Sequence, residues 1–371
     1  MKKTILIVAS VLALALTSVA KAEISLSAYQ EFFAGSADQS KYKGSENHGI
    51  DKAGMTDGNY SRITATGSAT LDSGIEVNAF YNIARDCAGS DTTNCGVAVN
   101  GNGVGFSGGF GAITVGEIFD IGAQMYSRLT AGVPTGEPDG GMLGHFYTGS
   151  SEEYGSANET NYAQNDMKIR FNSNSYSGFS FAASYSPNSG QKNVGGGDDG
   201  QTNNYVTNKL FNDIMHVAAK YTIDIDGIGF TAAYGQLSGN AGRIGSTDYA
   251  DLDETVYSIA LSYNGFTIDY RKNDAGDSGE TKSGQAGGDQ GASMCAKYAM
   301  GNIGLGACAI TTDFVDTSSL SNQAKTRTYS ADYKLGGGVT LGVVVFDVEQ
   351  TANSVVKTDV DGIVSKLSFG F

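Results

Sequence analysis

Residues 120–164 form a long polar stretch that is crowded with carboxylates. Its acidic residues are Asp120, Glu137, Asp139, Glu152, Glu153 and Glu159, and its one Lys or Arg is Arg128. Connections longer than about 15 residues usually have a function. Carboxylates gathered in one segment attract cations and repel anions, which biases the passage of solutes. The chemistry that this stretch suggests is therefore electrostatic.

The remaining motifs do not point to catalysis. The three histidines, at positions 48, 145 and 216, are scattered, and no HExxH motif or serine–histidine–acid order stands out. The stretch GVGFSG at 103–108 formally matches a nucleotide-binding G-x-G-x-x-G motif. It lies inside an alternating strand with no helix after it, so the match does not indicate a nucleotide-binding site. The sequence predicts a protein that is not an enzyme.

The elements that must position the charges are β-strands, because apolar residues recur at every second position. In RITATGSATL, for example, Ile63, Ala65 and Leu71 share one face, and Arg62 and Thr64 share the other. Each run is about as long as a tilted strand that crosses a membrane. Sixteen such strands are expected, at residues 24–34, 60–71, 75–85, 102–109, 112–119, 165–174, 178–186, 213–223, 228–238, 254–264, 266–273, 292–300, 303–314, 326–335, 339–350 and 360–371.

The connections alternate between long loops and tight turns. Long loops are expected at 35–59, 86–101, 120–164, 187–212, 239–253, 274–291, 315–325 and 351–359, with turns such as Asn264-Gly265 between them. An even number of strands with short turns at one end and long loops at the other is typical of an outer-membrane barrel. We therefore expect an all-β fold, a 16-stranded antiparallel transmembrane β-barrel. A soluble β-sandwich and a surface-exposed β-solenoid are the alternatives.

In such a barrel the alternation decides which charges face the water-filled lumen. The basic residues opposite the apolar set are Arg62, Lys168, Arg170, Lys220, Arg271, Lys297, Lys334 and Lys366. The acids on the same side are Glu31, Glu76, Asp269 and Asp332. A positive wall opposite an acidic loop would create a transverse field that biases the passage of solutes. Lys168 and Arg170 lie on the expected strand that follows residues 120–164, and Arg62 lies on an earlier strand; these three are the expected partners of that loop. A solvated charge away from the narrowest point is the alternative for each.

The N-terminus reads as a secretory signal peptide over residues 1–22, which leaves Glu23 as the first mature residue. Its apolar run is about half the length that a membrane anchor needs. Without these residues the chain keeps 21 basic and 39 acidic residues, a net charge of −18. This balance argues against nucleic acid as a partner.

Four cysteines in an exported chain predict disulfides. Cys87 and Cys95 are expected to clasp the second long loop. If Gly301-Asn302 is a two-residue turn, Cys295 and Cys308 face each other across the hairpin in a non-hydrogen-bonded pair. Such a pair brings the Cα atoms to about 4.5 Å, within the range for a disulfide. The alternative is a free, reduced pair.

Several stretches carry a family resemblance: EISLSAY, SRITATGSATLDSGIEVNAF, VGFSGGFGAITVGEIFD, YKLGGGVTLGV and the last strand, which ends in Phe. In these stretches the sequence resembles the general bacterial porins, and in particular those of alphaproteobacteria. The resemblance implies one porin barrel over 23–371, a homotrimer, and a third long loop that folds into the pore as a constriction. An external loop is the alternative for that segment. The resemblance makes Glu137, Asp139 and Asp120 candidate constriction acids, and makes Phe371, with Phe369, part of the signal read by the barrel-assembly machinery.

The function that follows is an outer-membrane porin, a water-filled channel through which small hydrophilic solutes and ions diffuse passively. The alternatives are a substrate-selective channel and, less favoured, a barrel-fold outer-membrane hydrolase. Outer-membrane lipid and lipopolysaccharide are the expected surroundings. No cofactor is expected; a structural Ca²⁺ among the acidic loops is the alternative.

Replacing the candidate constriction acids should change ion selectivity. The net charge of −18 and the acidic third loop predict a modest cation preference, so Glu137→Gln combined with Asp139→Asn should shift the reversal potential toward anions. Reversal potentials across planar bilayers in asymmetric KCl measure this shift. An unchanged potential would mean that these residues do not line the narrow point.

Overall fold

The computed structural model describes residues 23–38, 52–57, 61–86, 96–127, 146, 167–188, 211–241, 243–244, 247–278, 290–315, 321–352 and 355–371. Nearly all of them lie in strands. The strands are β1 (Glu23–Asp38), β2 (Lys52–Asp57), β3 (Arg62–Thr70), β4 (Glu76–Asp86), β5 (Gly96–Gly108), β6 (Gly111–Glu117), β7 (Met167–Asn172), β8 (Phe179–Asn188), β9 (Phe211–Ile225), β10 (Ile228–Ala241), β11 (Arg243–Ile244), β12 (Thr247–Asp248), β13 (Leu252–Tyr263), β14 (Phe266–Asp274), β15 (Gln290–Met300), β16 (Ile303–Val315), β17 (Ser321–Gly336), β18 (Val339–Ala352) and β19 (Val355–Gly370). Among the described residues, no helix has the length and apolar character needed to cross a membrane.

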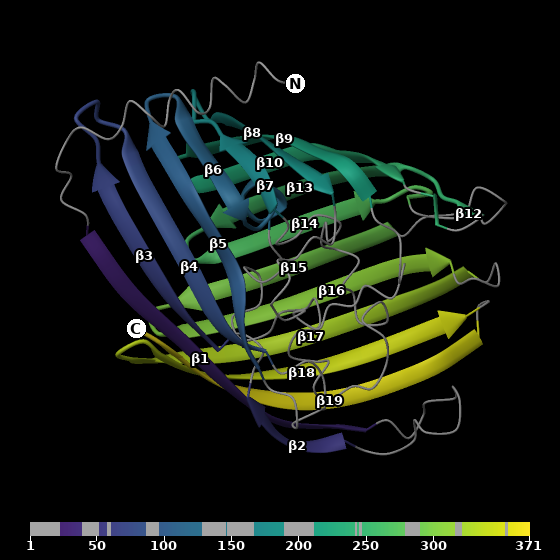
Figure 1. Ribbon diagram of the computed structural model, residues 1–371. Helices are drawn as coiled ribbons and strands as arrows, with labels where there is room; N and C mark the ends of the chain where they lie inside the picture. The colour runs from purple at the N-terminus through teal and green to yellow at the C-terminus, as the bar shows by residue number, and fades with distance from the viewer. Residues whose placement is uncertain are drawn as a thin grey trace.

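The strands form one closed antiparallel barrel (Figure 1). Successive strands pair in order, and β19 pairs with β1 from Tyr29↔Gly370 to Asp38↔Asp361. The chain end completes the seam, because the amides and carbonyls of Ala28 and Phe371 exchange hydrogen bonds of 2.6 and 3.0 Å. The predicted 16-stranded barrel is confirmed.

Two details differ from the expected strand list. The second wall strand has two parts, because β2 pairs with the C-terminal half of β1 and β3 pairs with its N-terminal half. The expected long loop at 35–59 therefore contains part of a wall strand. In addition, β11 and β12 form a two-residue hairpin inside the expected loop at 239–253. The two residues of β11 and of β12 are too few to show a period-two pattern, and β2 has only two apolar side chains, Ala53 and Met55.

The alternation in the sequence appears directly as two faces of the wall. On β17, Tyr329 is 61% exposed on the outside, whereas its neighbours Thr328 and Ser330 are buried on the inside. The apolar outer face ends where Arg327 and Asp347 form an outward ion pair with a 2.6 Å contact between Nη1 and Oδ1. An apolar band bounded by charges on the outside is the pattern of a transmembrane barrel.

Tight turns keep the register of the hairpins. At the β13–β14 turn, Asn264 and Gly265 both have positive φ, 45° and 82°. This is the backbone of a type I′ turn, whose twist matches that of the flanking strands. The turn leaves Tyr263 directly opposite Phe266.

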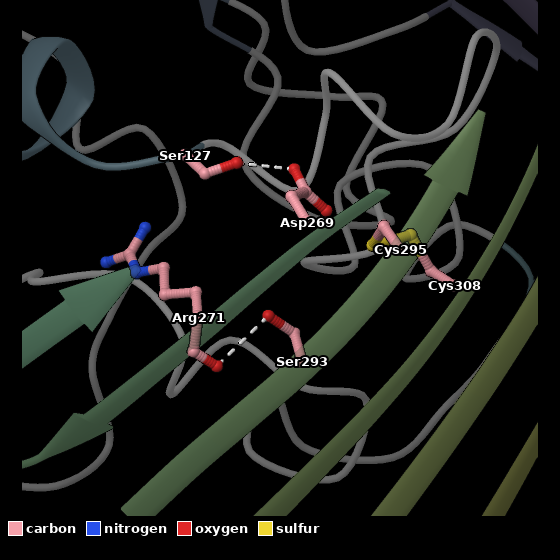
Figure 2. Close-up of a disulfide and its surroundings, with 6 residues drawn as sticks. All are labelled: Ser127, Asp269, Arg271, Ser293, Cys295 and Cys308. Atoms are coloured by element: carbon pink, nitrogen blue, oxygen red, sulfur yellow. Dashed lines mark hydrogen bonds between the residues drawn. A yellow bond between two sulfur atoms is a disulfide. The ribbon is translucent and has the colours of Figure 1, made fainter. Parts of the chain in front are cut away.

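The β15–β16 hairpin carries the predicted disulfide (Figure 2). Met300 pairs with Ile303, and the same register places Cys295 opposite Cys308 with a Cα–Cα distance of 4.1 Å. Both cysteines are buried on the lumen side, while Met294 is exposed on the outside. The pairing of Cys295 with Cys308 is confirmed. Cys87 and Cys95 lie outside the described residues, so their bridge stays a prediction.

The closing seam makes the last residue a test of assembly. Deleting Phe371 removes both backbone hydrogen bonds to Ala28 and an exposed ring from the outer apolar face. We expect less folded protein in the membrane fraction, measured by heat-modifiable mobility on gels. Phe371→Tyr keeps the backbone and an aromatic ring, so it should assemble normally. Normal amounts of folded protein from the deletion variant would contradict this expectation.

Candidate functional site

The connection that follows β6 turns into the barrel instead of leaving it. Residues 118–127, called here the inward segment, include the short helix α2 (Gly122–Met125). Ile118 and Ile121 in this segment are buried. The wall makes room for it at Gly103 on β5, where an added Cβ would lie 3.1 Å from the Ile118 side chain. The inward-folded third connection is therefore confirmed for its described part.

A polar cluster, called here the clasp, fixes the inward segment to β8 and β9. Asp120 accepts hydrogen bonds from the Ser184 hydroxyl at 2.6 Å and from the Ile121 amide at 2.7 Å. Its other carboxylate oxygen contacts Nδ1 of His216. The second ring nitrogen of His216 lies 2.7 Å from the Tyr126 hydroxyl. Asp120, Ser184, His216 and Tyr126 thus form a continuous chain of hydrogen bonds that joins two points of the inward segment to the wall.

The clasp is buried, and this sets the charge of its carboxylate. Burial by itself raises the pKa of the Asp120 carboxyl, but the nearby His216 and Lys168, with the hydrogen bonds from His216 and Ser184, hold that pKa below its usual value. The contribution of Asp120 to stability is therefore present at neutral pH and is lost only as the pH falls through this lowered pKa. Burial raises the pKa of the Tyr126 hydroxyl, so Tyr126 stays neutral.

Tyr126 fills a recess that the wall strands leave open. A Cβ at Gly235 on β10 would lie 1.9 Å from the Tyr126 hydroxyl oxygen, so only glycine fits there. The Arg271 guanidinium carbon lies 5.4 Å from the centre of the Tyr126 ring, within cation–π range. Small side chains, among them Ala182 and Ala218, surround the ring in one buried cluster. The wall is shaped for this side chain.

Three basic wall residues hold the backbone of the inward segment. Lys168 Nζ donates to the Ile118 carbonyl at 2.7 Å, and Arg170 Nη1 donates to the Phe119 carbonyl at 2.9 Å. Lys220 Nζ donates to the Gln124 carbonyl at 2.8 Å. All three side chains lie on the lumen side, as the alternation predicts. They lie against the connection and bond its carbonyl groups.

The end of the inward segment is fixed on β13 and β14. The Ser127 hydroxyl donates to Asp269 at 2.5 Å, and the Ser127 amide donates to the Ser258 hydroxyl at 3.0 Å. Figure 2 shows Ser127 pointing to Asp269 beside the disulfide, because Asp269 pairs with Cys295 across the strands. The contacts of the inward segment thus run along the wall from β7 to β14.

The remaining predicted lumen charges lie apart from the clasp. Lys366 on β19 pairs with Glu31 on β1 at 3.0 Å. Arg62 on β3 and Lys297 on β15 are partly exposed on the lumen side of their strands. Asp120, Lys168 and Arg170 are brought together, whereas Arg62, Lys297 and Lys366 are not. Glu137 and Asp139 lie outside the described residues.

The two terminal aromatic residues lie on the opposite face of the wall. Phe369 packs edge-on against Phe32 with ring centroids 6.5 Å apart. Phe371 is largely exposed on the same outer face. Their position agrees with the alternation read from the last strand.

Sequence reasoning missed several residues of the site. His216 belongs to no motif in the sequence, and Tyr126 and Ser184 gave no signal by type or spacing. Phe146 belongs to the same connection between β6 and β7. Its side chain is only 2% exposed and lies in an apolar cluster on the lumen side. One signal was available for this cluster, because GVVVFDV on β18 is apolar on both faces. Such a strand needs a cover on its lumen side as well.

One acidic group on the outer face has the spacing of a metal site. Carboxylate oxygens of Asp347, Asp359 and Asp361 all lie within 4.8 Å of one another. Asp347 is already engaged by Arg327, which supplies a positive charge to the group. We assign no ion to this group.

Comparisons with known proteins agree with this architecture. A sequence profile of Gram-negative porins matches residues 9–353. The comparison with curated proteins returned no match.

Solved structures with the same fold include the anion-selective porin from Comamonas acidovorans, with 13% identity, a TM-score of 0.60, and coverage of 95% of this chain and 100% of that one. A variant of the Rh. blastica porin is 18% identical, with a TM-score of 0.58 and coverage of 94% and 100%. A loop-deletion variant of an outer membrane protein of Vibrio cholerae is 11% identical, with a TM-score of 0.59 and coverage of 94% and 99%.

Removing the carboxylate of the clasp should destabilise the protein. Asp120→Ala leaves the buried His216 ring without its Nδ1 partner, which should cost about 1–3 kcal/mol and lower the midpoint of thermal unfolding in detergent. Asp72→Ala, at an exposed turn, is the matched control and should leave the midpoint unchanged. Equal midpoints for both variants would show that the clasp does not hold the inward segment.

Proposed function

The chain belongs to the Gram-negative porin family, and we propose that it lets small hydrophilic solutes and ions diffuse passively through its lumen. The protein is an outer-membrane porin channel by family. The observation that carries the proposal is the pair of faces on most of the wall strands, apolar outside and polar or charged inside. A wall of this kind stabilises a column of water within a lipid bilayer.

The inward segment supports a sieving role. It is held against the wall by Asp120, Lys168, Arg170 and Lys220, so a solute must pass beside a fixed structure. Pore width and the charges that line it are the usual determinants of which solutes pass. Among the residues that the structure describes, nothing couples passage to an energy source, and we propose diffusion down a gradient.

We propose a modest preference for cations. The net charge of −18 on the mature chain and the acidic third connection favour cations at the pore mouth. The positive charges of Lys168, Arg170 and Lys220 reduce this preference, although all three are engaged by backbone carbonyls. The structurally similar Comamonas acidovorans porin is anion-selective, so the barrel fold itself leaves the sign of selectivity open.

The partners that we propose follow from the outer face and the chain end. The exposed aromatic and aliphatic side chains suit lipid tails, and the charged rim above them, with Arg327 and Asp347, suits lipopolysaccharide head groups. We also propose a homotrimer and recognition of Phe371 by the barrel-assembly machinery, both from family resemblance.

The alternative to a general diffusion channel is a channel that is selective for a single class of solute. It would share the fold and differ in the lining of the narrow point.

We infer that the protein is not an enzyme, in agreement with its family. Asp120 and His216 resemble part of a hydrolase relay, but His216 is fully buried and both of its ring nitrogens are engaged. The pair therefore supports a structural role.

Passive diffusion predicts ion conductance and solute flux across membranes that contain the purified protein. Protein reconstituted in planar bilayers should give a current that rises in proportion to KCl concentration, and liposomes should swell at rates that fall steadily with sugar size. Heat-denatured protein is the control. Bilayers that stay sealed with folded protein would contradict the proposal, and block of the current by one solute at low concentration would favour the selective channel.

A further inference from the structure

The lumen side of β18, β19 and β1 is apolar where water would be expected. Val344 is fully buried there, while the adjacent Val345 is 48% exposed on the outside. We call this surface the apolar patch; its residues are Phe33, Ala37, Val344, Phe346, Val348, Val360 and Val364. Apolar surface left in water costs about 25 cal/mol per Å², so a cover over this patch on the lumen side stabilises the structure.

Two glycines let the apolar patch lie close to the backbone of the wall. A Cβ at Gly362 would lie 2.1 Å from the Phe346 ring, so the ring rests directly on this strand. A Cβ at Gly35 would lie 2.9 Å from a methyl group of Val364. The patch therefore lies close against the backbone of the wall, where another apolar side chain can pack on it.

Phe146 is part of the cover. Its ring belongs to the same buried cluster as the apolar patch and is 2% exposed. It comes from the connection whose inward segment is clasped on β8 and β9. In the closed ring of strands, β9 and β10 lie across from β19 and β1, as Figure 1 also shows. One connection is therefore held on two opposite walls.

The two attachments differ in chemistry. The clasp consists of hydrogen bonds around the charged Asp120, whereas Phe146 packs in a cluster of buried apolar side chains. On the same wall, the Lys366 Nζ lies 5.7 Å from the Phe33 ring and is paired with Glu31. Apolar packing of this kind depends on shape and on buried apolar area.

We propose that Phe146 is a positioning residue, which docks in the apolar patch, fixes the far side of the third connection and thereby sets the size limit of the pore. This inference rests on the proposed channel function. Releasing Phe146 leaves the clasp intact and removes the attachment of the connection to the apolar patch. The cross-section open to solutes then increases.

The test compares Phe146→Ala with wild type in the full-length protein. The readout is the ratio of liposome swelling rates for the largest and smallest permeant sugars, together with single-channel conductance in KCl. We expect this ratio to rise several-fold in Phe146→Ala and the conductance to increase. Phe146→Leu retains an apolar side chain and should restore the wild-type ratio. Phe181→Ala removes a phenylalanine from the outer face and should leave the ratio unchanged.

A second variant changes the receptor side of the contact. Val344→Thr keeps nearly the same shape but makes the apolar patch polar, and it should raise the ratio in the same direction. It also decides the question if Phe146→Ala fails to assemble. An unchanged or lower ratio in the assembled variants, even with reduced thermal stability, would overturn the proposal. A wild-type protein that does not conduct would instead contradict the channel function, which is measured before any variant.

Discussion

The structure depends on one constraint: a sheet that crosses hydrocarbon must leave no backbone group unpaired. The chain meets it by pairing β19 with β1, down to the hydrogen bonds between Ala28 and Phe371. Closure gives every strand an outer face toward lipid and an inner face toward the lumen. The polar half of each strand then has to face inward, and the lumen acquires its charges from the same alternation that makes the outside apolar.

The inner face in turn positions the connection that enters it. Lys168, Arg170 and Lys220 place their donors at the carbonyl groups of a segment that has little regular structure of its own. Buried carbonyl groups need partners, and here the wall supplies them. The inward segment is therefore an extension of the wall, and its position follows from the strand register.

The alternation alone predicts most of the fold. It assigns Arg62 and Lys168 to the lumen, and the turn at Gly301-Asn302 is enough to place Cys295 opposite Cys308. The site is different, because Asp120 meets His216 across 96 positions of sequence and Tyr126 meets it across 90. Periodicity assigns a side chain to a face but does not identify what covers that face. The same limit applies to Phe146, whose burial depends on a wall more than 180 positions away, at Val344 and Phe346.

The Cys295–Cys308 bridge has a consequence for how the barrel acquires its shape. A slip of one residue between two strands exchanges their inner and outer faces, and the shear of a barrel depends on all of its strand offsets. A covalent bond between directly opposed residues permits a single alignment of the β15–β16 hairpin. Oxidation after export can therefore lock the offset of this hairpin while the rest of the chain is still unpaired. The hairpin then provides a fixed alignment against which the strands on either side can pair.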